Sequence, residues 1–314
     1  MKLYAGIDGG QSSTTAVIAD GAGKILGAGR SGPADEVGAD ASSTRLRDAL
    51  ELAIDRALRA AGLFPDTEFA AVVAGVSGYN GSPVGLRPHV HTRNFQMLHD
   101  ARVAHAAAFH AGEGILVIAG TGSVAFGVNE LGEECRIGGW GYLFGDEGSA
   151  FWIGRRLIER AMRDQESGLR SPVTPPVLNY FSVRRLSEIS DGFYAGQIDR
   201  AAVAALAKTA FELAEQGLDD ARFIVEQAAD AIAALAATCA RRLHANRRVI
   251  GHPVPVALSG GLLQNGRFAA RIHACLADRL PEATIAAVKN KPAEGALLLA
   301  YRADGIDPAP ALRD

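Results

Sequence analysis

The chain of 314 residues is 48% hydrophobic and 21% charged, so it can bury the core of one large or two medium domains. Its formal net charge of -3 gives no basic surplus for binding a run of phosphates, which argues against a nucleic-acid partner. The three cysteines, Cys135, Cys239 and Cys275, lack metal-ligand spacing and are odd in number, which indicates a reducing compartment without a disulfide framework. No export or mitochondrial signal precedes the first apolar run, and charged residues interrupt the later apolar stretches. We therefore expect a cytoplasmic protein that does not enter a membrane.

The first hundred residues predict a meander of three strands, then a helix and two further strands. Glycine-containing turns separate the strands of the meander, and a left-handed C-cap at Gly62 is expected to end the helix. The predicted elements are strands Leu3–Ile7, Thr14–Ala19 and Lys24–Ala28, a helix over about Ser43–Ala61, and strands Ala70–Val76 and Asn94–Leu98. The last of these strands leads into Asp100 and an alanine-rich helical stretch.

The second half of the chain opens with the same order of parts. Strands Ile115–Ala119, Val124–Asn129 and Glu134–Ile137 are separated by turns at matching points, which indicates an internal duplication of whole domains. A Gly-rich insert over residues 138–148, a helix from about Ala150 and a surface connector over 167–176 are expected next. Residues 199–244 are expected to be mostly helical, with a break at Gly217. A strand over Val254–Leu258 and a helix from about Asn265 follow. A closing helix over about 293–303 could cross back to the first domain.

Two turns of similar composition follow the first apolar strand of each half: Asp8–Thr14 and Gly120–Ser123. Their glycines allow backbone N–H groups to approach an anion closely, and their hydroxyl groups add donors. Either turn alone is more simply interpreted as a hairpin. Two such turns at matching points of a duplicated unit favour a site that grips a polyphosphate from both sides. No P-loop, dinucleotide-binding glycine motif or nucleophile elbow accompanies them.

Four ordered blocks of sequence carry a resemblance to a known family: Gly6–Gly10, Gly120–Ser123, Gly138–Ser149 and Leu258–Gly261. They resemble the N-acetylglucosamine kinase branch of the BadF/BadG ATPase family, in the actin- and hexokinase-like superfamily, and the third block is the most diagnostic. The resemblance covers nearly the whole chain. It implies an α/β fold of two duplicated actin-like (ribonuclease H-like) domains around a nucleotide and sugar cleft. The N-terminal domain would comprise residues 1–112 plus 291–314, and the C-terminal domain residues 113–290.

The resemblance also implies an activity, the transfer of the terminal phosphate of Mg-ATP to the 6-OH of N-acetylglucosamine or glucosamine. Asp100 matches the catalytic carboxylate that accepts the proton of the attacking hydroxyl, and Asp8 and Asp146 match the carboxylates near Mg²⁺. The residues that match ATP-contacting positions are Gly9, Gly10, Gln11, Ser12, Ser13, Thr14, Gly120, Thr121, Gly122, Gly260, Gly261 and Asn265. Those that match sugar-contacting positions are Asp35, Asp100, Ser123, Gly139, Trp140, Gly141 and Asp146.

Several of these residues also have a purely structural interpretation. Asp100 is placed to cap the helix that follows it, a role compatible with catalysis. Asp146 would add a favourable charge near the start of the next helix, and Asp8 alone could simply stabilise its own turn. Trp140, taken alone, would more often be a core residue. The segment 260–265, taken alone, would be the start of a helix after a strand.

Asp35 marks a departure from the family that the chain resembles. Many amino-sugar kinases of that family use an Asn after the first meander to contact the sugar, whereas this stretch is Ser31-Gly32-Pro33-Ala34-Asp35. A carboxylate at this point would pair with the ammonium group of free glucosamine. Alternatively, Asp35 belongs to a solvated loop and the acetyl pocket lies elsewhere. N-acetylglucosamine and glucosamine are therefore both expected substrates.

Two other classes of function are weighed against the kinase. An ATPase that activates a partner protein, as the radical-dehydratase activators of the same family do, would need cysteines for an iron–sulfur cluster, and three scattered cysteines argue against it. A sugar-sensing repressor would need a DNA-binding domain, and the first strand starts too early to leave room for one ahead of it. For the kinase, the expected partners are a small sugar and a second copy of the chain in a homodimer.

Overall fold

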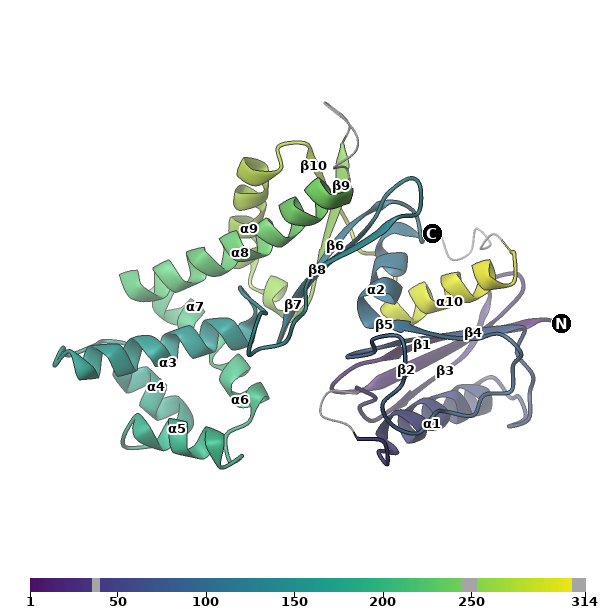
Figure 1. Cartoon of the computed structure of the whole chain (residues 1–314), viewed down its shortest axis with the longest axis horizontal. Coiled ribbons are helices and arrows are strands. Elements are labelled where there is room, and N and C mark those ends of the chain that lie inside the picture. Colours follow the sequence, from purple (N-terminus) through teal and green to yellow (C-terminus); the bar gives the residue numbers. More distant parts are fainter. Residues whose placement is uncertain (36–39, 244–252, 307–314) are drawn as a thin grey trace. The chain divides into compact units, whose positions relative to one another are not determined.

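The computed structural model describes residues 1–35, 40–243 and 253–306. These residues form two five-stranded sheets with helices packed on them, and the chain divides into two compact units (Figure 1). The first unit comprises Met1–Leu116, Val128–Gly132 and Ala286–Asp314, and the second comprises Val117–Gly127 and Glu133–Ile285. The expected α/β class is therefore confirmed.

The first sheet has the strand order β3-β2-β1-β4-β5. Its strands are β1 (Leu3–Gly9), β2 (Thr14–Asp20), β3 (Ile25–Ser31), β4 (Ala71–Val76) and β5 (Phe95–His99). Strands β1, β2 and β3 pair antiparallel, which is the predicted meander, whereas the β1–β4 and β4–β5 pairs are parallel. The parallel strands therefore end at one edge of the sheet.

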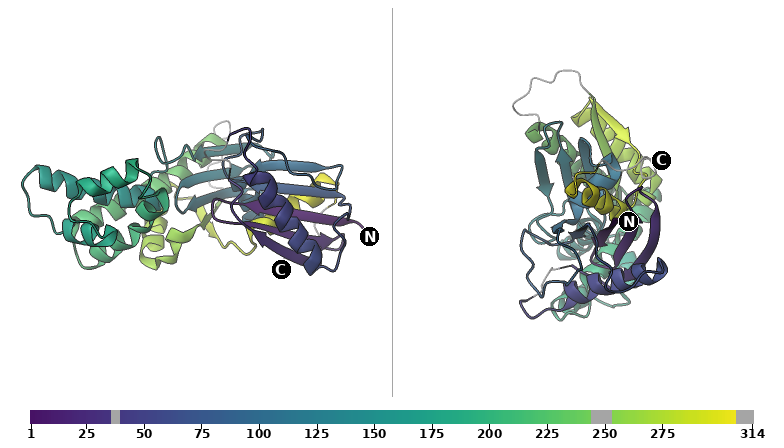
Figure 2. Two further views of the ribbon diagram at one scale, coloured as in Figure 1. Left: turned by 90° about the horizontal axis from the view of Figure 1, so that it is seen from below. Right: turned by 90° about the vertical axis from the view of Figure 1, so that its right-hand side faces the viewer.

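Helices cover both faces of the first sheet (Figure 2). Helix α1 (Arg45–Ala60) packs mainly on β3 and β2, while α2 (Asp100–Phe109) and α10 (Pro292–Ala303) pack on each other and on β4. Neighbouring residues of β4 enter different cores, because side chains alternate across a strand: Val72 packs in the α1 core and Val73 in the α10 core. The last described helix of the chain thus completes the core of the first unit.

The second sheet has the strand order β8-β7-β6-β9-β10, which repeats the order of the first sheet strand for strand. Its strands are β6 (Gly114–Ala119), β7 (Ser123–Val128), β8 (Glu134–Gly138), β9 (Val254–Ser259) and β10 (Ala283–Ala286). The equal order confirms the predicted duplication. Strand β10 was not predicted, because it has only four residues and none of them is fully buried.

The second unit carries most of the helices. They are α3 (Ala150–Glu166), α4 (Thr174–Phe181), α5 (Ser187–Tyr194), α6 (Arg200–Ala205), α7 (Ala207–Glu215), α8 (Asp219–Leu243), the 3-10 helix η1 (Gly261–Gln264) and α9 (Gly266–Arg279). The prediction of a surface connector over 167–176 is wrong at the C-terminal end of that range. Helix α4 starts at Thr174, because its prolines lie in the first turn, where a helix tolerates them. The last residue of the predicted 199–244 helical stretch lies outside the described residues.

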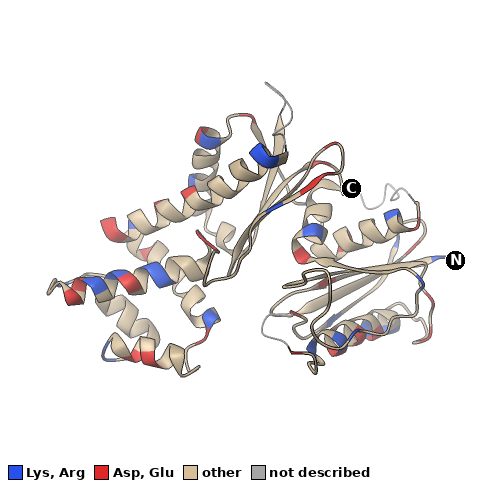
Figure 3. Ribbon diagram, in the orientation of Figure 1, with Lys and Arg blue, Asp and Glu red and all other residues tan. Residues whose placement is uncertain are grey.

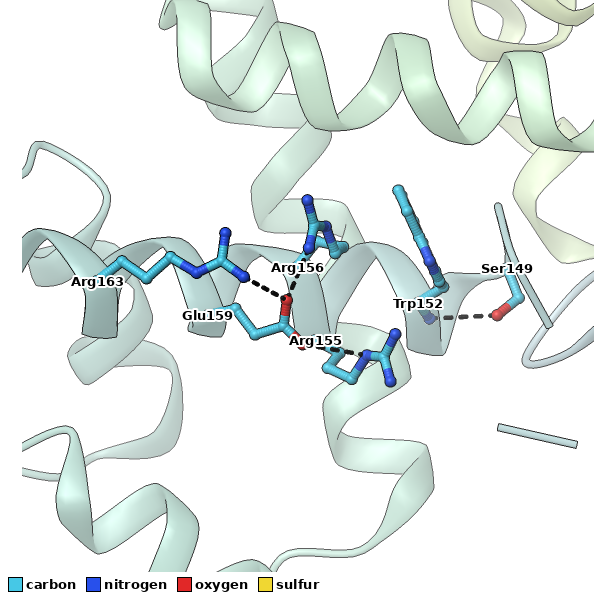
Figure 4. Close-up of polar contacts among 6 residues, drawn as sticks. All are labelled: Ser149, Trp152, Arg155, Arg156, Glu159 and Arg163. Atoms are coloured by element: carbon cyan, nitrogen blue, oxygen red, sulfur yellow. Dashed lines mark hydrogen bonds and ion pairs between the residues drawn. The ribbon is translucent and has the colours of Figure 1, made fainter. Parts of the chain in front are cut away.

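Helix α3 follows the Gly-rich insert and carries charges of both signs along its length (Figure 3). The Oγ of Ser149 accepts a hydrogen bond from the N–H of Trp152 at 3.2 Å and caps the helix. Further along, Glu159 lies within 4.0 Å of three arginines (Figure 4), namely Arg155, Arg156 and Arg163. Such pairs, three or four residues apart, each stabilise a helix by only about 0.2–0.5 kcal/mol. The cap therefore contributes more than any one pair to fixing the end of the Gly-rich insert.

Among the described residues, α8 alone is long and apolar enough to cross a membrane by length and composition. One side of it, including Ala228, Ile232 and Cys239, is buried, and the helix packs on α7, α9 and β8. These contacts are those of a helix in the core of the second unit.

Candidate active site

The candidate catalytic residues of the first unit lie at one edge of its sheet. Asp8 is near the end of β1, Ser77 directly follows β4, and Asp100 directly follows β5. Because these three strands are neighbours and parallel, their carboxyl ends bring the three side chains to the same edge. This is the edge at which open parallel sheets bind ligands.

Asp100 has several hydrogen-bond partners that favour its ionised form. Its Oδ1 lies 2.7 Å from Nδ1 of His99 and accepts the N–H of Ala101 at 2.8 Å, and its carboxylate also accepts the hydroxyl of Ser77. Burial by itself raises the pKa of Asp100, but these hydrogen bonds and the charge of His99 outweigh it and hold the pKa below its ordinary value. The side chain stays 30% exposed, so a substrate hydroxyl can reach it.

The prediction that Asp100 caps its helix is wrong by one residue. His99 occupies the N-cap position with an extended backbone, and the N–H of Ala101 donates to Oδ1 of Asp100 at 2.8 Å, which leaves Nδ1 of His99 to donate to the same carboxylate. Asp100 is the first residue of α2. Its carboxylate nevertheless lies at the positive end of the helix dipole, which also favours the ionised form.

Asp8 is the predicted metal ligand of the first unit. Burial, and then the negative charge of Asp100, raise the pKa of Asp8 to about 6. A divalent cation would relieve this repulsion, and Mg²⁺ commonly binds one or two carboxylates together with substrate phosphates. The described residues contain no group of three His, Cys, Asp or Glu side chains that could hold a metal ion. The Asp8 carboxylate fits Mg²⁺ that arrives with a nucleotide, because the nucleotide phosphates would supply further oxygen ligands.

The first glycine turn is held by its own backbone. The N–H of Gly10 donates to the carbonyl of Ser13 at 3.0 Å, and the buried hydroxyl of Thr14 donates to the carbonyl of Gly32 at 2.8 Å. Gln11 and Ser12 are exposed at the tip of the turn. Gln11 and Ser12 are thus free to meet a phosphate, whereas Thr14 contributes mainly to the shape of the turn.

Asp35 is not part of a solvated loop, and that interpretation is wrong. Its side chain is buried, at 8% exposure, and its Oδ2 lies 3.5 Å from the guanidinium of Arg45 at the start of α1. The carboxylate therefore already has a cationic partner. The contact of Asp35 with a sugar stays a prediction.

The second glycine turn, in the second unit, contacts the start of α3. The N–H of Gly120 donates to the carbonyl of Gly122 at 3.0 Å, and the N–H of Ala150 donates to the carbonyl of Gly120 at 2.9 Å. Thr121 is exposed at the tip. Ser123 is buried, and its hydroxyl donates to the carbonyl of Glu147 at 2.8 Å. The turn and the Gly-rich insert are therefore one connected structure.

Asp146 lies directly against this turn. Its side chain is buried, its Oδ1 accepts the N–H of Ser123 at 3.3 Å, and its Oδ2 lies 2.9 Å from Arg200. Burial raises the pKa of Asp146, although the Ser123 N–H and Arg200 oppose the shift. A Cβ at Gly122 would lie 2.8 Å from Oδ2 of Asp146, so only glycine fits there. Both oxygens have protein partners, and Asp146 as a metal ligand stays a prediction.

The backbone of Asp146 has a φ of 60°, which is uncommon for a residue with a side chain. Such strain is tolerated where surrounding contacts determine it, and it is frequent at functional sites. Arg200 was not predicted from the sequence, because an ion pair across 54 residues leaves no pattern of spacing in the chain.

The Gly-rich insert exposes an aromatic side chain. Trp140 is 71% exposed, which excludes the core interpretation, and the guanidinium of Arg136 lies 6.0 Å from its ring centroid. Gly139 and Gly141 on either side have left-handed φ values of 69° and 83°. An exposed ring between two such glycines can stack on the apolar face of a pyranose.

The segment after β9 also contacts β6. Gly260 has a φ of 115°, and a Cβ on it would lie 2.2 Å from the carbonyl of Ala119, so glycine is required for this close approach. Gly261 is exposed. Asn265 caps α9, because its Oδ1 accepts the N–H of Phe268 at 3.0 Å.

Asn265 also borders a cavity of about 250 Å³. The other lining residues are Phe211, Ala214, Glu215, Arg222, Val225, Arg267 and Phe268. The rings of Phe211 and Phe268 lie 5.2 Å apart. A lining of two aromatic rings beside an amide and charged groups is the kind of surface that an aromatic base can contact.

The three cysteines are free and buried. Burial raises the pKa of Cys239 and of Cys275, which leaves both thiols protonated at neutral pH.

Two units with the same sheet order, each with a glycine turn after its first strand, define an actin-like nucleotide-binding protein. The chain belongs to the BadF/BadG/BcrA/BcrD ATPase family, whose match covers residues 5–300. It is similar in fold to a solved protein from Chromobacterium violaceum described as an N-acetylglucosamine kinase, with a TM-score of 0.72, 23% identity and coverage of 96% of this chain and 99% of the other.

Two curated relatives are sugar kinases. The N-acetylmuramic acid/N-acetylglucosamine kinase of Clostridium acetobutylicum is 27% identical over 207 residues, which cover 65% of this chain and 66% of that enzyme. The N-acetyl-D-glucosamine kinase of Dictyostelium discoideum is 24% identical over 315 residues, which cover 95% of this chain and 98% of that enzyme.

Proposed function

We propose that this chain is an ATP-dependent amino-sugar kinase that phosphorylates the 6-OH of N-acetylglucosamine or glucosamine. The observation that carries the proposal is the pair of carboxylates, Asp8 and Asp100, at the carboxyl edge of the first sheet, with Asp100 held ionised. Family membership and the names of the two curated relatives support it.

Asp100 accepts the proton of the attacking hydroxyl. General-base action needs a carboxylate that is ionised at working pH and reachable by the substrate, and Asp100 meets both conditions. Because phosphoryl transfer needs little covalent help from the protein, placing the hydroxyl and stabilising charge are the main tasks of the site.

ATP binds the two glycine turns through backbone N–H groups, with the exposed Gln11, Ser12 and Thr121 as further donors. The adenine base occupies the cavity beside Asn265. The Gly260-Gly261 turn, which precedes Asn265 in the chain, contacts the nucleotide through its backbone. Asp8 would hold Mg²⁺, which would neutralise the β- and γ-phosphate oxygens.

The sugar binds the Gly-rich insert. Trp140 supplies a ring for the pyranose, the neighbouring glycines Gly139 and Gly141 permit close backbone approach, and Asp146 accepts hydrogen bonds from sugar hydroxyls. Each carboxylate oxygen has a second lone pair, so the bonds from Ser123 and Arg200 leave Asp146 able to accept more. We further propose a cytoplasmic homodimer that binds neither nucleic acid nor membrane.

The test is an ADP-release assay with Mg-ATP and a panel of glucosamine, N-acetylglucosamine, N-acetylmannosamine, N-acetylmuramate and glucose, with the product located by phosphorus NMR. We expect one amino sugar to raise ADP release strongly and to be phosphorylated at O6. ATP hydrolysis that no sugar changes, but that a protein partner stimulates, would contradict the proposal in favour of the activator class.

A further inference from the structure

Arg200, the first residue of α6, contacts two points of the Gly-rich insert. One guanidinium nitrogen lies 2.9 Å from Oδ2 of Asp146, and the guanidinium carbon lies 5.2 Å from the ring centroid of Tyr142. The ring of Phe151, on α3, lies 6.0 Å from the same carbon and 5.0 Å from the ring of Tyr142. Arg200 therefore joins the insert to α3 and α6.

The ion pair of Arg200 with Asp146 is largely withdrawn from water. The side chain of Arg200 is 21% exposed and that of Asp146 is 5% exposed. Removal of one partner from such an ion pair leaves an uncompensated buried charge and is strongly destabilising at that point. The Nε–H of Arg200 is buried and has no hydrogen-bond partner among the described residues, an unsatisfied donor of the kind that calls for a functional explanation.

The insert needs an external support. Four of its glycines, Gly138, Gly139, Gly141 and Gly148, have left-handed φ values, and glycine loses more backbone freedom on ordering than any other residue. The insert also places Leu143 and Phe144 at 67% and 81% exposure, so their burial does not anchor it. Tyr142 is anchored by the rings and the guanidinium around it, and Asp146 by Ser123 and Arg200.

We infer that Arg200 is the positioning residue of the sugar-binding insert: it holds Asp146 and Tyr142 so that the carboxylate and the Trp140 ring can bind the sugar together. The inference rests on the proposed kinase function, but it assigns a role to a residue outside the sugar-contacting segment. Arg200 acts through Asp146 and Tyr142 and does not itself contact the reacting atoms. Its loss is therefore expected to weaken sugar binding much more than ATP binding, because the 120–123 turn keeps its own backbone hydrogen bonds at Gly120 and Ala150.

The first experiment compares Arg200→Met, Arg200→Lys and the wild-type enzyme in steady-state kinetics. Arg200→Met is expected to raise the KM for the sugar by about tenfold or more, the cost of losing a charge-assisted contact, while the KM for ATP stays within about twofold. Arg200→Lys keeps the charge but not the planar group, so it should recover only part of the loss. Equal changes in both KM values would overturn the inference, because they indicate general damage.

The matched control is Arg160→Met. Arg160 forms ion pairs at 3.0 Å with Asp164 and 3.1 Å with Asp220, away from the insert, so it tests the loss of an arginine from a helix of the same unit. A rise in sugar KM as large as that of Arg200→Met would assign the effect to stability alone. A double mutant of Arg200→Met with Asp146→Asn should be much less than multiplicative in sugar KM, since both changes break one pair.

A second experiment measures the mobility of the insert directly and needs no sugar. The chain has two tryptophans, and Trp152→Phe leaves Trp140 as the single emitter, on the exposed part of the insert. Arg200→Met in this background is expected to lower the fluorescence anisotropy of Trp140, and Arg160→Met to leave it unchanged. Unchanged anisotropy in both variants would overturn the inference. Failure of the wild type to phosphorylate any sugar would contradict the proposed function, while the anisotropy would still decide whether Arg200 fixes the insert.

Discussion

His99 Nδ1 lies 2.7 Å from Oδ1 of Asp100, so the proposed catalytic base and its neighbour in sequence are direct partners. His99 also occupies the N-cap position of the helix that starts at Asp100. One residue thus fixes the backbone that presents the carboxylate and stabilises the charge of the carboxylate. This arrangement favours proton acceptance at Asp100 over a purely structural role.

Asp100→Asn is expected to lower kcat by roughly a hundredfold or more while the affinities for ATP and sugar are retained, because only the proton acceptor is lost. Steady-state kinetics and equilibrium binding of both substrates check this. A kcat within about threefold of the wild type would remove Asp100 from the mechanism. A variant that no longer folds, as judged by thermal unfolding, would indicate that the contacts of Asp100 to His99 and Ala101 are needed for the fold, and the role of Asp100 would then be structural.

Asp8→Asn is expected to raise the Mg²⁺ concentration needed for half-maximal activity by about tenfold or more, because the amide keeps the shape but loses the charge that the cation needs. The measurement is ADP release against Mg²⁺ concentration at saturating ATP and sugar. Glu51→Gln, a change to a carboxylate that accepts the backbone N–H of His89 in the same unit, is the matched control and should leave the Mg²⁺ requirement unchanged. An unchanged requirement in Asp8→Asn would show that the metal is held elsewhere.

Much of the fold could be predicted from local patterns. The turns at 8–14 and 120–123 follow apolar strands, and this repetition was enough to infer the duplication that the two equal strand orders confirm. The positions of Asp8 and Asp100 at the ends of strands in the first half of the chain followed from the same pattern and from the family resemblance. Local patterns carry this information because turns and strand ends depend on residues close in sequence.

The features of the fold and of the site that were not predicted depend on tertiary contacts, which leave no pattern in the local sequence. The pairing of Asp35 with Arg45 and that of Asp146 with Arg200 join residues 10 and 54 positions apart on different elements. Helix α4 was missed because prolines usually mark a loop, although its own lie where a helix accepts them. The exposure of Trp140 was not predictable from composition, since a tryptophan is more often at least partly buried.

His105 makes the stability of the first unit depend on pH. The side chain is 2% exposed, its Nε2 lies 2.9 Å from the carbonyl of Gly114, and burial, with a smaller contribution from Arg102, lowers its pKa from 6.5 to about 4. Between these values the unfolded chain binds a proton that the folded chain does not. The stability from neutral His105 is therefore fully present above about pH 6.5 and is lost as the pH falls to about 4, by up to about 3 kcal/mol.

His105→Gln is expected to flatten this dependence, because the amide can still donate to Gly114 but does not titrate. Urea unfolding of the variant and of the wild type at several pH values between 7 and 4.5 measures the slope. His273→Gln, a change at an exposed histidine, is the control and should keep the wild-type slope. Equal slopes in all three proteins would mean that other groups dominate the acid response.

The contact between Gly122 and Asp146 predicts opposite effects for two alanine substitutions in one turn. A Cβ at Gly122 would lie 2.8 Å from Oδ2 and 3.0 Å from Cγ of Asp146, whereas a Cβ at Gly120 would meet no atom within 4 Å. Neither glycine has a left-handed φ, so the clash alone separates them. The carboxylate cannot move aside freely, because Ser123 and Arg200 hold its two oxygens.

Gly122→Ala is therefore expected to destabilise the ligand-free protein by about 1–3 kcal/mol, the usual cost of forcing extra volume into a packed site. Gly120→Ala is expected to be neutral or to stabilise it by up to about 1 kcal/mol, since alanine reduces the freedom of the unfolded chain. Urea unfolding without nucleotide or sugar gives both values on one scale, free of any effect on substrate binding. Equal stabilities of the two variants would mean that the Asp146 carboxylate does not pack against Gly122 of the second glycine turn. The same result would remove the physical basis for treating the turn and the Gly-rich insert as one connected structure.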